Sequence, residues 1–288
     1  MSQFNLDSLK PEVVGRLRQL SHIALDMDGT IYNGDTLLTC TLPFLEQVRE
    51  LGIGYSFVTN NPSKGVEDYL KKLRGMGVPV EADQLYTSAM ATIDYLHREH
   101  PQARHLFVLG TRSMLDEFAA AGFTFSVDDH LDEPDAVVIG FDLTLTYARI
   151  CRAAWWMAQG KPCIATNPDR VCPTDQPTVL VDCGAICAML ESATGRAPDK
   201  VLGKPDPDML RGIVDRFSIC TSQIAMVGDR LYTDMLMAER AGALGVLVLT
   251  GECTRQDVAD AARAPDLVVP SLAEFGELLN WLKAGCDA

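Results

Sequence analysis

The stretch His22-Ile-Ala-Leu-Asp26-Met-Asp28-Gly29-Thr30 decides how this chain folds, because an apolar run ends there in two spaced acids. Successive side chains of a strand alternate between its faces, so Asp26 and Asp28 are expected to project to the same side. Acids at the carboxyl end of a parallel strand stand where ligands bind in open α/β sheets. One such carboxylate can attack a substrate while the other moves a proton, and the pair can hold a hard cation. The residues alone leave one alternative, a simple turn at Asp28-Gly29.

Short apolar runs alternate with amphipathic stretches along the chain, which predicts repeated βα units. The apolar runs are nearly unbroken, as expected for strands covered on both faces, so the predicted fold is α/β with a doubly wound parallel sheet. The expected strands are His22–Leu25, Gly54–Val58, Leu106–Leu109, Ala136–Ile139, Pro162–Ala165, Ile224–Val227, Gly245–Leu249 and Asp266–Val269. The expected helices include Leu42–Leu51, Gly65–Met76, Ser113–Ala121, Tyr147–Gln159, Pro207–Phe217 and Thr233–Ala241.

Three more strand-end features follow along the chain. Thr59-Asn60-Asn61 offers a hydroxyl and backbone N–H groups that could cradle an anion, although the same residues are also ordinary loop chemistry. Lys204 lies on a stiff turn before a helix, where a solvated surface lysine is the alternative. Asp229 and Asp234 lie in Gly228-Asp-Arg-Leu-Tyr-Thr-Asp234, where helix capping is the alternative.

The order Asp-x-Asp-Gly-Thr, Thr, Lys and Gly-Asp followed by a further Asp resembles the haloacid dehalogenase (HAD) superfamily of aspartate-nucleophile phosphatases. The stretches Thr59-Asn60-Asn61, Ala165-Thr-Asn167-Pro-Asp169 and Gly228–Asp234 are similar to its class IIA branch. That branch includes NagD-like nucleotide phosphatases, p-nitrophenyl phosphatases, and phosphoglycolate and pyridoxal phosphate phosphatases. The resemblance covers nearly the whole chain and implies a Rossmann-like core with a cap domain.

The resemblance also implies a role for each motif residue. Asp26 would attack phosphorus and form an aspartyl-phosphate, and Asp28 would protonate the leaving group and then activate water. The metal would be Mg²⁺, held by the Asp26 and Asp229 carboxylates and the Asp28 carbonyl, with Asp234 holding the site through water or another residue. The residues expected to bind the transferring phosphoryl oxygens are Thr59, Asn60, Asn61 and Lys204.

The spacing of the motifs locates the cap. Only 33 residues separate Asp26 from Thr59, whereas 145 separate Thr59 from Lys204, far more than one βα unit requires. We therefore expect a C2-type cap domain at residues 84–197, inserted into a catalytic core at residues 1–83 and 198–288. Such caps set substrate specificity by closing over the active site.

The loop Ala165–Thr174 is the expected substrate-facing part of the cap, with Asn167, Asp169 and Cys172 as its candidate residues. The alternative is a cap turn in which Asn167 and Asp169 bond to their own backbone. Pyridoxal phosphate phosphatases resemble this chain but carry a His where Cys172 stands, which argues against that substrate.

The composition restricts the partners and the cellular location that can be expected. The net charge of −14 over 288 residues disfavours nucleic acid and anionic membranes as partners. Nine cysteines without a CxxC pair are expected to be reduced and mostly buried, and no signal peptide or membrane span is recognisable, so a cytoplasmic protein is expected. The five histidines are expected to be solvated. Trp155 and Trp156 cannot both face a helix core, so an exposed one could mark a homodimer contact through the cap.

The sequence thus predicts a Mg²⁺-dependent hydrolase, a phosphatase acting on small phosphomonoesters such as sugar phosphates, nucleotides or p-nitrophenyl phosphate. Two alternatives stay open. One is a receiver-like signalling module, which also places an acceptor Asp and a Lys on a doubly wound sheet. The other is a non-catalytic protein that binds a phosphate ligand.

Overall fold

The computed structural model describes residues 9–174 and 176–284. The chain forms two compact units, the first comprising Met1–Val58, Lys72–Leu85 and Leu210–Ala288, and the second Thr59–Lys71 and Tyr86–Met209. The chain passes from one unit to the other within β4 (Gly54–Thr59), α3 (Val66–Gly75), β5 (Leu85–Thr87) and α8 (Asp208–Phe217). The assignment of residues 84–197 as a cap domain stays a prediction.

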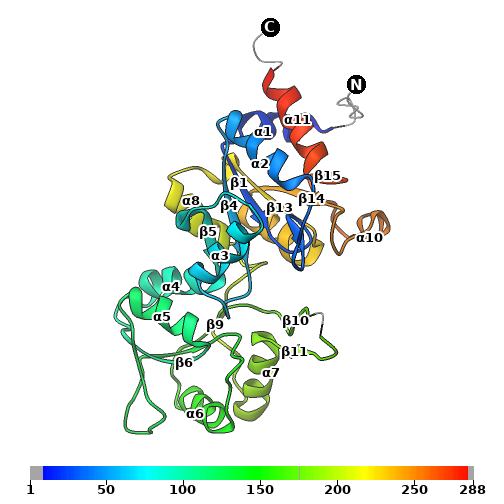
Figure 1. Cartoon of the computed structure of the whole chain (residues 1–288). Helices are drawn as coiled ribbons and strands as arrows, with labels where there is room; N and C mark the ends of the chain where they lie inside the picture. Colours follow the sequence, from blue (N-terminus) through cyan, green and yellow to red (C-terminus); the bar gives the residue numbers. More distant parts are fainter. Residues whose placement is uncertain (1–8, 175, 285–288) are drawn as a thin grey trace. The chain divides into compact units, whose positions relative to one another are not determined.

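The first unit is built on a six-stranded sheet in the order β15-β14-β13-β1-β4-β5 (Figure 1). Strand β1 (His22–Asp26) is central and pairs in parallel with β13 (Ile224–Gly228) and β4. Strands β14 (Leu244–Val248) and β15 (Leu267–Val269) continue the sheet in parallel. The other elements are the hairpin β2 (Tyr32–Asn33) and β3 (Thr36–Leu37), and the helices α1 (Pro11–Gln19), α2 (Thr41–Glu50), α9 (Leu236–Ala241), α10 (Arg255–Asp260) and α11 (Leu272–Ala284).

The second unit has its own parallel sheet in the order β12-β9-β8-β6-β7. These strands are β6 (His105–Leu109), β7 (Thr124–Phe125), β8 (Ala136–Ile139), β9 (Cys163–Ala165) and β12 (Lys200–Val201). Its helices are α4 (Ser88–Glu99), α5 (Arg112–Ala120), α6 (Tyr147–Ala158) and α7 (Cys183–Thr194), and β10 (Val171–Cys172) pairs antiparallel with β11 (Leu180–Val181).

Burial explains why the apolar runs became strands. All five residues of β1, β13 and β14 are buried, which is the pattern of strands covered on both faces. The predicted parallel α/β fold is confirmed, and each expected strand agrees with the observed one within one residue at either end.

Several sequence expectations need correction. The stretch Thr233–Ala241 is not one α-helix, because a π-helical turn, Leu231–Met235, precedes α9. His22 is not solvated but only 3% exposed, since it begins the central strand. Trp156 is buried and Trp155 is 48% exposed, as the adjacent positions on α6 predict.

The cysteines are also less buried than expected. Eight lie within the described residues, all as free thiols, and four of them are buried. Cys151 and Cys220 are exposed, and Cys286 lies outside the described residues. Within residues 9–174 and 176–284, no helix combines the length and apolar character needed to cross a membrane.

Candidate active site

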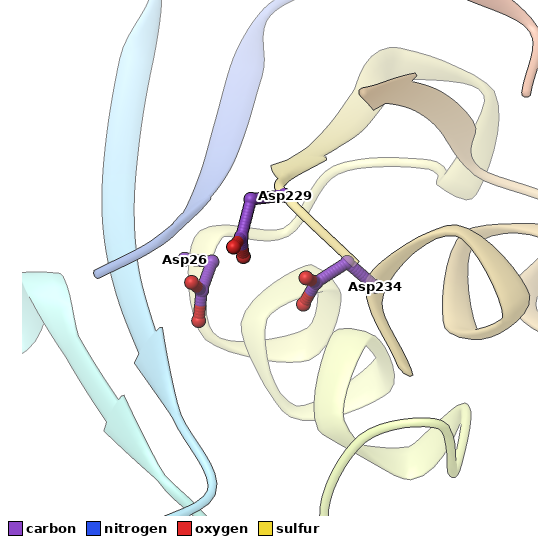
Figure 2. Close-up of side chains that lie close together, drawn as sticks. All are labelled: Asp26, Asp229 and Asp234. Carbon is purple, nitrogen blue, oxygen red and sulfur yellow. The ribbon is translucent and has the colours of Figure 1, made fainter. Parts of the chain in front are cut away.

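Three buried carboxylates converge at one end of the sheet of the first unit (Figure 2). Asp26 ends β1, Asp229 follows β13 directly, and Asp234 lies in the π-helical turn after it. One oxygen from each residue lies within 4.8 Å of the others, a grouping that could hold a metal ion. Because β1 and β13 are parallel neighbours, their carboxyl ends meet at the same edge, as the strand-end pattern predicted.

The turn after β1 brings Asp229 close to the chain. Gly29 has a φ of +85°, and a Cβ at this position would overlap the Asp229 carboxylate. The Gly29 N–H donates to the Tyr32 carbonyl over 2.8 Å, and the Thr250 hydroxyl donates to the Gly29 carbonyl over 2.6 Å. Glycine is therefore required at the fourth position of Asp-x-Asp-Gly-Thr.

The loop after β14 also belongs to this site, which the sequence did not reveal. Besides Thr250, it supplies the backbone N–H of Glu252, which donates to Asp229 Oδ2 over 2.7 Å. Gly251 lies so close to Asp229 that a Cβ there would overlap the carboxylate. The sequence could have indicated this loop only by its position, because it follows a third parallel strand of the same sheet.

The π-helical turn explains how an acid five residues after Asp229 returns to the site. The extra residue in a π-turn shifts the following side chains relative to an α-helix, and such turns occur often at functional sites. The Arg230 N–H donates to Asp234 Oδ2 over 3.2 Å, and Asp234 is fully buried. Gly228 packs directly against the Asp234 carboxylate, where a Cβ would overlap it.

Arg230 is a cation at this site that the sequence motifs did not indicate. Burial lowers the pKa of its guanidinium, but the neighbouring Tyr232, Asp229, Asp26 and Glu252 raise the pKa above its usual value overall. Its Nε lies 2.9 Å from a Glu252 carboxylate oxygen. Arg230 therefore offsets part of the negative charge around Asp26 and Asp229.

Asp28 is not one of the three residues of the carboxylate cluster. It is exposed, and its backbone forms an isolated bridge with Tyr32. The predicted metal contact of Asp28 uses its backbone carbonyl, and the predicted proton transfer uses its carboxylate. Both roles stay predictions.

The second unit brings together most of the other predicted residues. Asn60 follows β4, and its amide oxygen accepts from the Lys204 N–H over 2.6 Å while its amide nitrogen donates to the Lys204 carbonyl over 3.0 Å. The same nitrogen donates to Asp169 Oδ2 over 2.9 Å. The predicted phosphate residues Asn60 and Lys204 and the predicted cap residue Asp169 thus lie in direct contact.

Thr59 ends β4, and Asn61 lies in the loop that follows it. The Asn61 N–H donates to Thr59 Oγ1 over 3.2 Å, and the buried Tyr69 hydroxyl donates to the Asn61 carbonyl over 3.1 Å. Asn61 Nδ2 also contacts Cys172 Sγ at 3.6 Å. Burial raises the pKa of Tyr69, and its hydrogen bond with Thr59 opposes that shift only in part. Tyr69 stays a neutral donor that fixes the loop.

Asn167 is fully buried, and its amide bonds to other side chains rather than to its own backbone. Its Nδ2 donates to Asp182 Oδ1 over 3.0 Å and to Asp169 Oδ2 over 3.3 Å. Asp182 caps α7 by accepting from the Cys183 N–H. Burial raises the pKa of Asp182 to about 6, although the Asn167 hydrogen bond lowers it.

Comparisons with known proteins agree with this arrangement. Residues 23–124 match the family model described as haloacid dehalogenase-like hydrolase, and residues 201–275 match a HAD-hydrolase-like model. The ribonucleotide monophosphatase NagD of Escherichia coli strain K12 is 31% identical over 256 residues, covering 89% of this chain and 98% of that protein. An acid sugar phosphatase of Staphylococcus aureus is 32% identical, covering 84% of this chain and 91% of that protein. The structure of a 4-nitrophenylphosphatase from Thermotoga maritima superposes with a TM-score of 0.85 at 41% identity, covering 91% of this chain and 98% of the other.

The chain therefore belongs to the haloacid dehalogenase superfamily, in its NagD-like class IIA branch. It is a hydrolase, a phosphatase of phosphomonoesters. Phosphatases of this superfamily generally use a divalent metal ion. The donor set of Asp26, Asp229 and Asp234 fits such an ion, because hard divalent cations prefer carboxylate oxygens.

Proposed function

We propose that this enzyme hydrolyses small phosphomonoesters through an aspartyl-phosphate on Asp26, with Mg²⁺ as its metal. The candidate substrates are sugar phosphates, nucleotides and p-nitrophenyl phosphate. The observation that carries the proposal is the convergence of Asp26, Asp229 and Asp234 at the carboxyl end of a central parallel strand.

Mg²⁺ would be held by Asp26, Asp229 and the Asp28 carbonyl, with Asp234 completing the site directly or through water. When bound, the ion supplies positive charge that neutralises oxygens of the phosphoryl group. Arg230 remains beside the carboxylates as a second positive group.

The side chains carry the chemical steps. An Asp26 oxygen forms a bond to phosphorus as the ester oxygen leaves, and Asp28 gives its proton to that oxygen. Asp28 then takes a proton from the water that attacks phosphorus, and the Asp26–phosphorus bond breaks to release phosphate. We assign Thr59, Asn60, Asn61 and Lys204 to the phosphoryl oxygens, as the family resemblance implies.

Substrate choice is assigned to the predicted cap, whose proposed substrate-facing surface is the loop that carries Asn167, Asp169 and Cys172. Two curated relatives are named a ribonucleotide monophosphatase and an acid sugar phosphatase, which supports a small phosphate ester as substrate. A cytoplasmic location and a homodimer through the cap are also proposed. The exposed Trp155 supports the dimer contact.

The substitution Asp26→Asn tests the proposal. Mg²⁺-dependent release of p-nitrophenol from p-nitrophenyl phosphate should fall by about a thousandfold or more, because the nucleophile is lost. The matched control is Asp35→Asn, which changes a fully exposed carboxylate of the same unit and should leave the rate unchanged. Retention of more than about a tenth of the wild-type rate with an intact circular dichroism spectrum would refute the assignment of Asp26. Stoichiometric formation of a long-lived phosphoprotein by the wild type would instead favour the receiver-like alternative.

A further inference from the structure

The side-chain amide of Asn60 forms a pair of hydrogen bonds with the backbone of Lys204, like the pair that two strands exchange in a sheet. Its Oδ1 accepts from the Lys204 N–H over 2.6 Å, and its Nδ2 donates to the Lys204 carbonyl over 3.0 Å. The orientation of the amide is fixed by chemistry, because the flipped amide would oppose two donors on one side and two acceptors on the other. Asn60 therefore holds both backbone polar groups of Lys204.

Asp169 fixes the amide of Asn60 in turn. Its Oδ2 accepts from Asn60 Nδ2 over 2.9 Å and from Asn167 Nδ2 over 3.3 Å. The carboxylate of Asp169 thus lies against the two amides and accepts from both. Removal of Asp169 would deprive both amides of an acceptor, which is costly because Asn60 is half-buried and Asn167 is fully buried.

Strand order explains why these segments meet. The Asp169 loop follows β9, the Lys204 loop follows β12, and the two strands are parallel neighbours. The Leu202 N–H donates to the Ala165 carbonyl over 2.8 Å, continuing the pairing beyond β12. Gly203 has a φ of +73° and packs against Asn167, where a Cβ would lie 2.9 Å from the Asn167 Cβ.

We propose that Asn60 and Asp169 are positioning residues for Lys204, and that Asp169 acts on catalysis through Asn60 rather than by touching the substrate's leaving group. The inference rests on the proposed function, in which Lys204 binds the phosphoryl oxygens. Lys204 is only 5% exposed, so its side chain has little freedom once its backbone is held. A lysine bound to the phosphoryl group serves every phosphate ester alike, whereas a residue facing the leaving group distinguishes between esters.

The substitution Asp169→Ala removes the acceptor and should lower kcat/KM by about ten- to a hundredfold. The factor should be the same for p-nitrophenyl phosphate, a sugar phosphate and a nucleoside monophosphate, and inhibition by inorganic phosphate should weaken in parallel. Asp169→Asn keeps an oxygen for both amides and should recover most of the loss. Asn60→Asp places a carboxylate oxygen against two acceptors and should reproduce the uniform loss. Asp116→Ala, on the exposed surface of α5, is the control and should leave all rates unchanged.

A double-mutant cycle with Lys204→Ala separates this inference from the proposed function. We expect Asp169→Ala to add little further loss in the Lys204→Ala background, because both changes act on the same contact. Different loss factors for different esters, or a full additional loss in that background, would overturn the positioning role while leaving the phosphatase assignment intact. Full activity of Lys204→Ala would overturn the assignment of Lys204 in the proposed function, and this inference with it.

Discussion

Gly29 lies directly against the carboxylate of Asp229, where any Cβ would overlap Oδ2. Its φ of +85° adds a second constraint, because side chains rarely adopt that backbone conformation. We predict that Gly29→Ala displaces Asp229 from Asp26 and lowers kcat/KM for p-nitrophenyl phosphate by about a hundredfold or more. A titration of the activity with Mg²⁺ should show a weaker apparent metal affinity as well.

Gly34 offers a matched control for this prediction. It also has a positive φ, +58°, but a Cβ there would meet nothing within 4 Å. Gly34→Ala should therefore cost backbone strain of only about 1 kcal/mol and leave catalysis nearly unchanged. Equal activity of Gly29→Ala and Gly34→Ala would show that the approach of Gly29 to Asp229 is unimportant for the site.

The three buried carboxylates are expected to destabilise the metal-free fold and to bind the metal ion. Asp26, Asp229 and Asp234 repel one another when no metal is bound, and Arg230 offsets only part of their charge. Asp234→Asn keeps the shape of the side chain and the acceptor for the Arg230 N–H. In EDTA we expect this variant to have a Tm equal to or above that of the wild type. With Mg²⁺ at about a hundred times its Kd, the wild type should gain about 2.7 kcal/mol, and the variant much less.

Thermal melts with and without Mg²⁺, with Asp35→Asn as the control, measure both effects. A variant that is less stable than the wild type in EDTA, yet gains as much from Mg²⁺, would contradict the role of Asp234. Such a result would point instead to a structural function for the π-helical turn.

Much of the fold could be predicted because local sequence determined it. Fully buried parallel strands require unbroken apolar runs, so β1, β13 and β14 were visible without a structure. Two-residue strands such as β7 and β12 were not visible, since they are defined by pairing with distant segments and carry no period of their own.

In the candidate site, too, some contacts could be predicted from the sequence and others could not. Asp26 and Asp229 follow long strands, so their convergence could be expected from the parallel order alone. The hydrogen bonds of Asn60 to Lys204 and Asp169 could not, because they join residues more than 100 positions apart through loop conformations. The burial of His22 could not be predicted for a related reason, since a polar residue at the start of an apolar run is also typical of a solvated strand end.

His22 predicts a loss of stability in mild acid. Burial lowers its pKa to about 4 in the folded chain, while an unfolded chain has the ordinary value of 6.5. Its Nε2 lies 2.8 Å from Ser56 Oγ, and its ring packs 4.4 Å from the ring of Phe217. As the pH falls, the unfolded chain is protonated at His22 before the folded chain is. The contribution of neutral His22 to the free energy of unfolding is therefore fully present above pH 6.5 and is lost as the pH falls toward 4.

Urea unfolding at pH 7 and pH 5 measures this effect. We expect the wild type to lose about 2 kcal/mol over that interval through His22. His22→Gln, which cannot be protonated, should lose correspondingly less, while the exposed His130→Gln should behave as the wild type. The same pH dependence in all three proteins would rule out His22 as the titrating group.

Asp182 predicts the opposite dependence in the second unit. Burial raises its pKa to about 6 from the ordinary 3.8, so the folded chain favours the protonated form. The contribution of protonated Asp182 to the free energy of unfolding is fully present below pH 3.8 and is lost as the pH rises through about 6. Asp182→Asn keeps an oxygen to accept from Asn167 and from the Cys183 N–H, and Asn caps helices as well as Asp does. The variant should therefore match the wild type near pH 4 and exceed its unfolding free energy by about 2 kcal/mol at pH 8. Urea unfolding across this range tests the expectation, and a constant difference at every pH would show that the carboxyl group of Asp182 does not titrate differently in the folded chain.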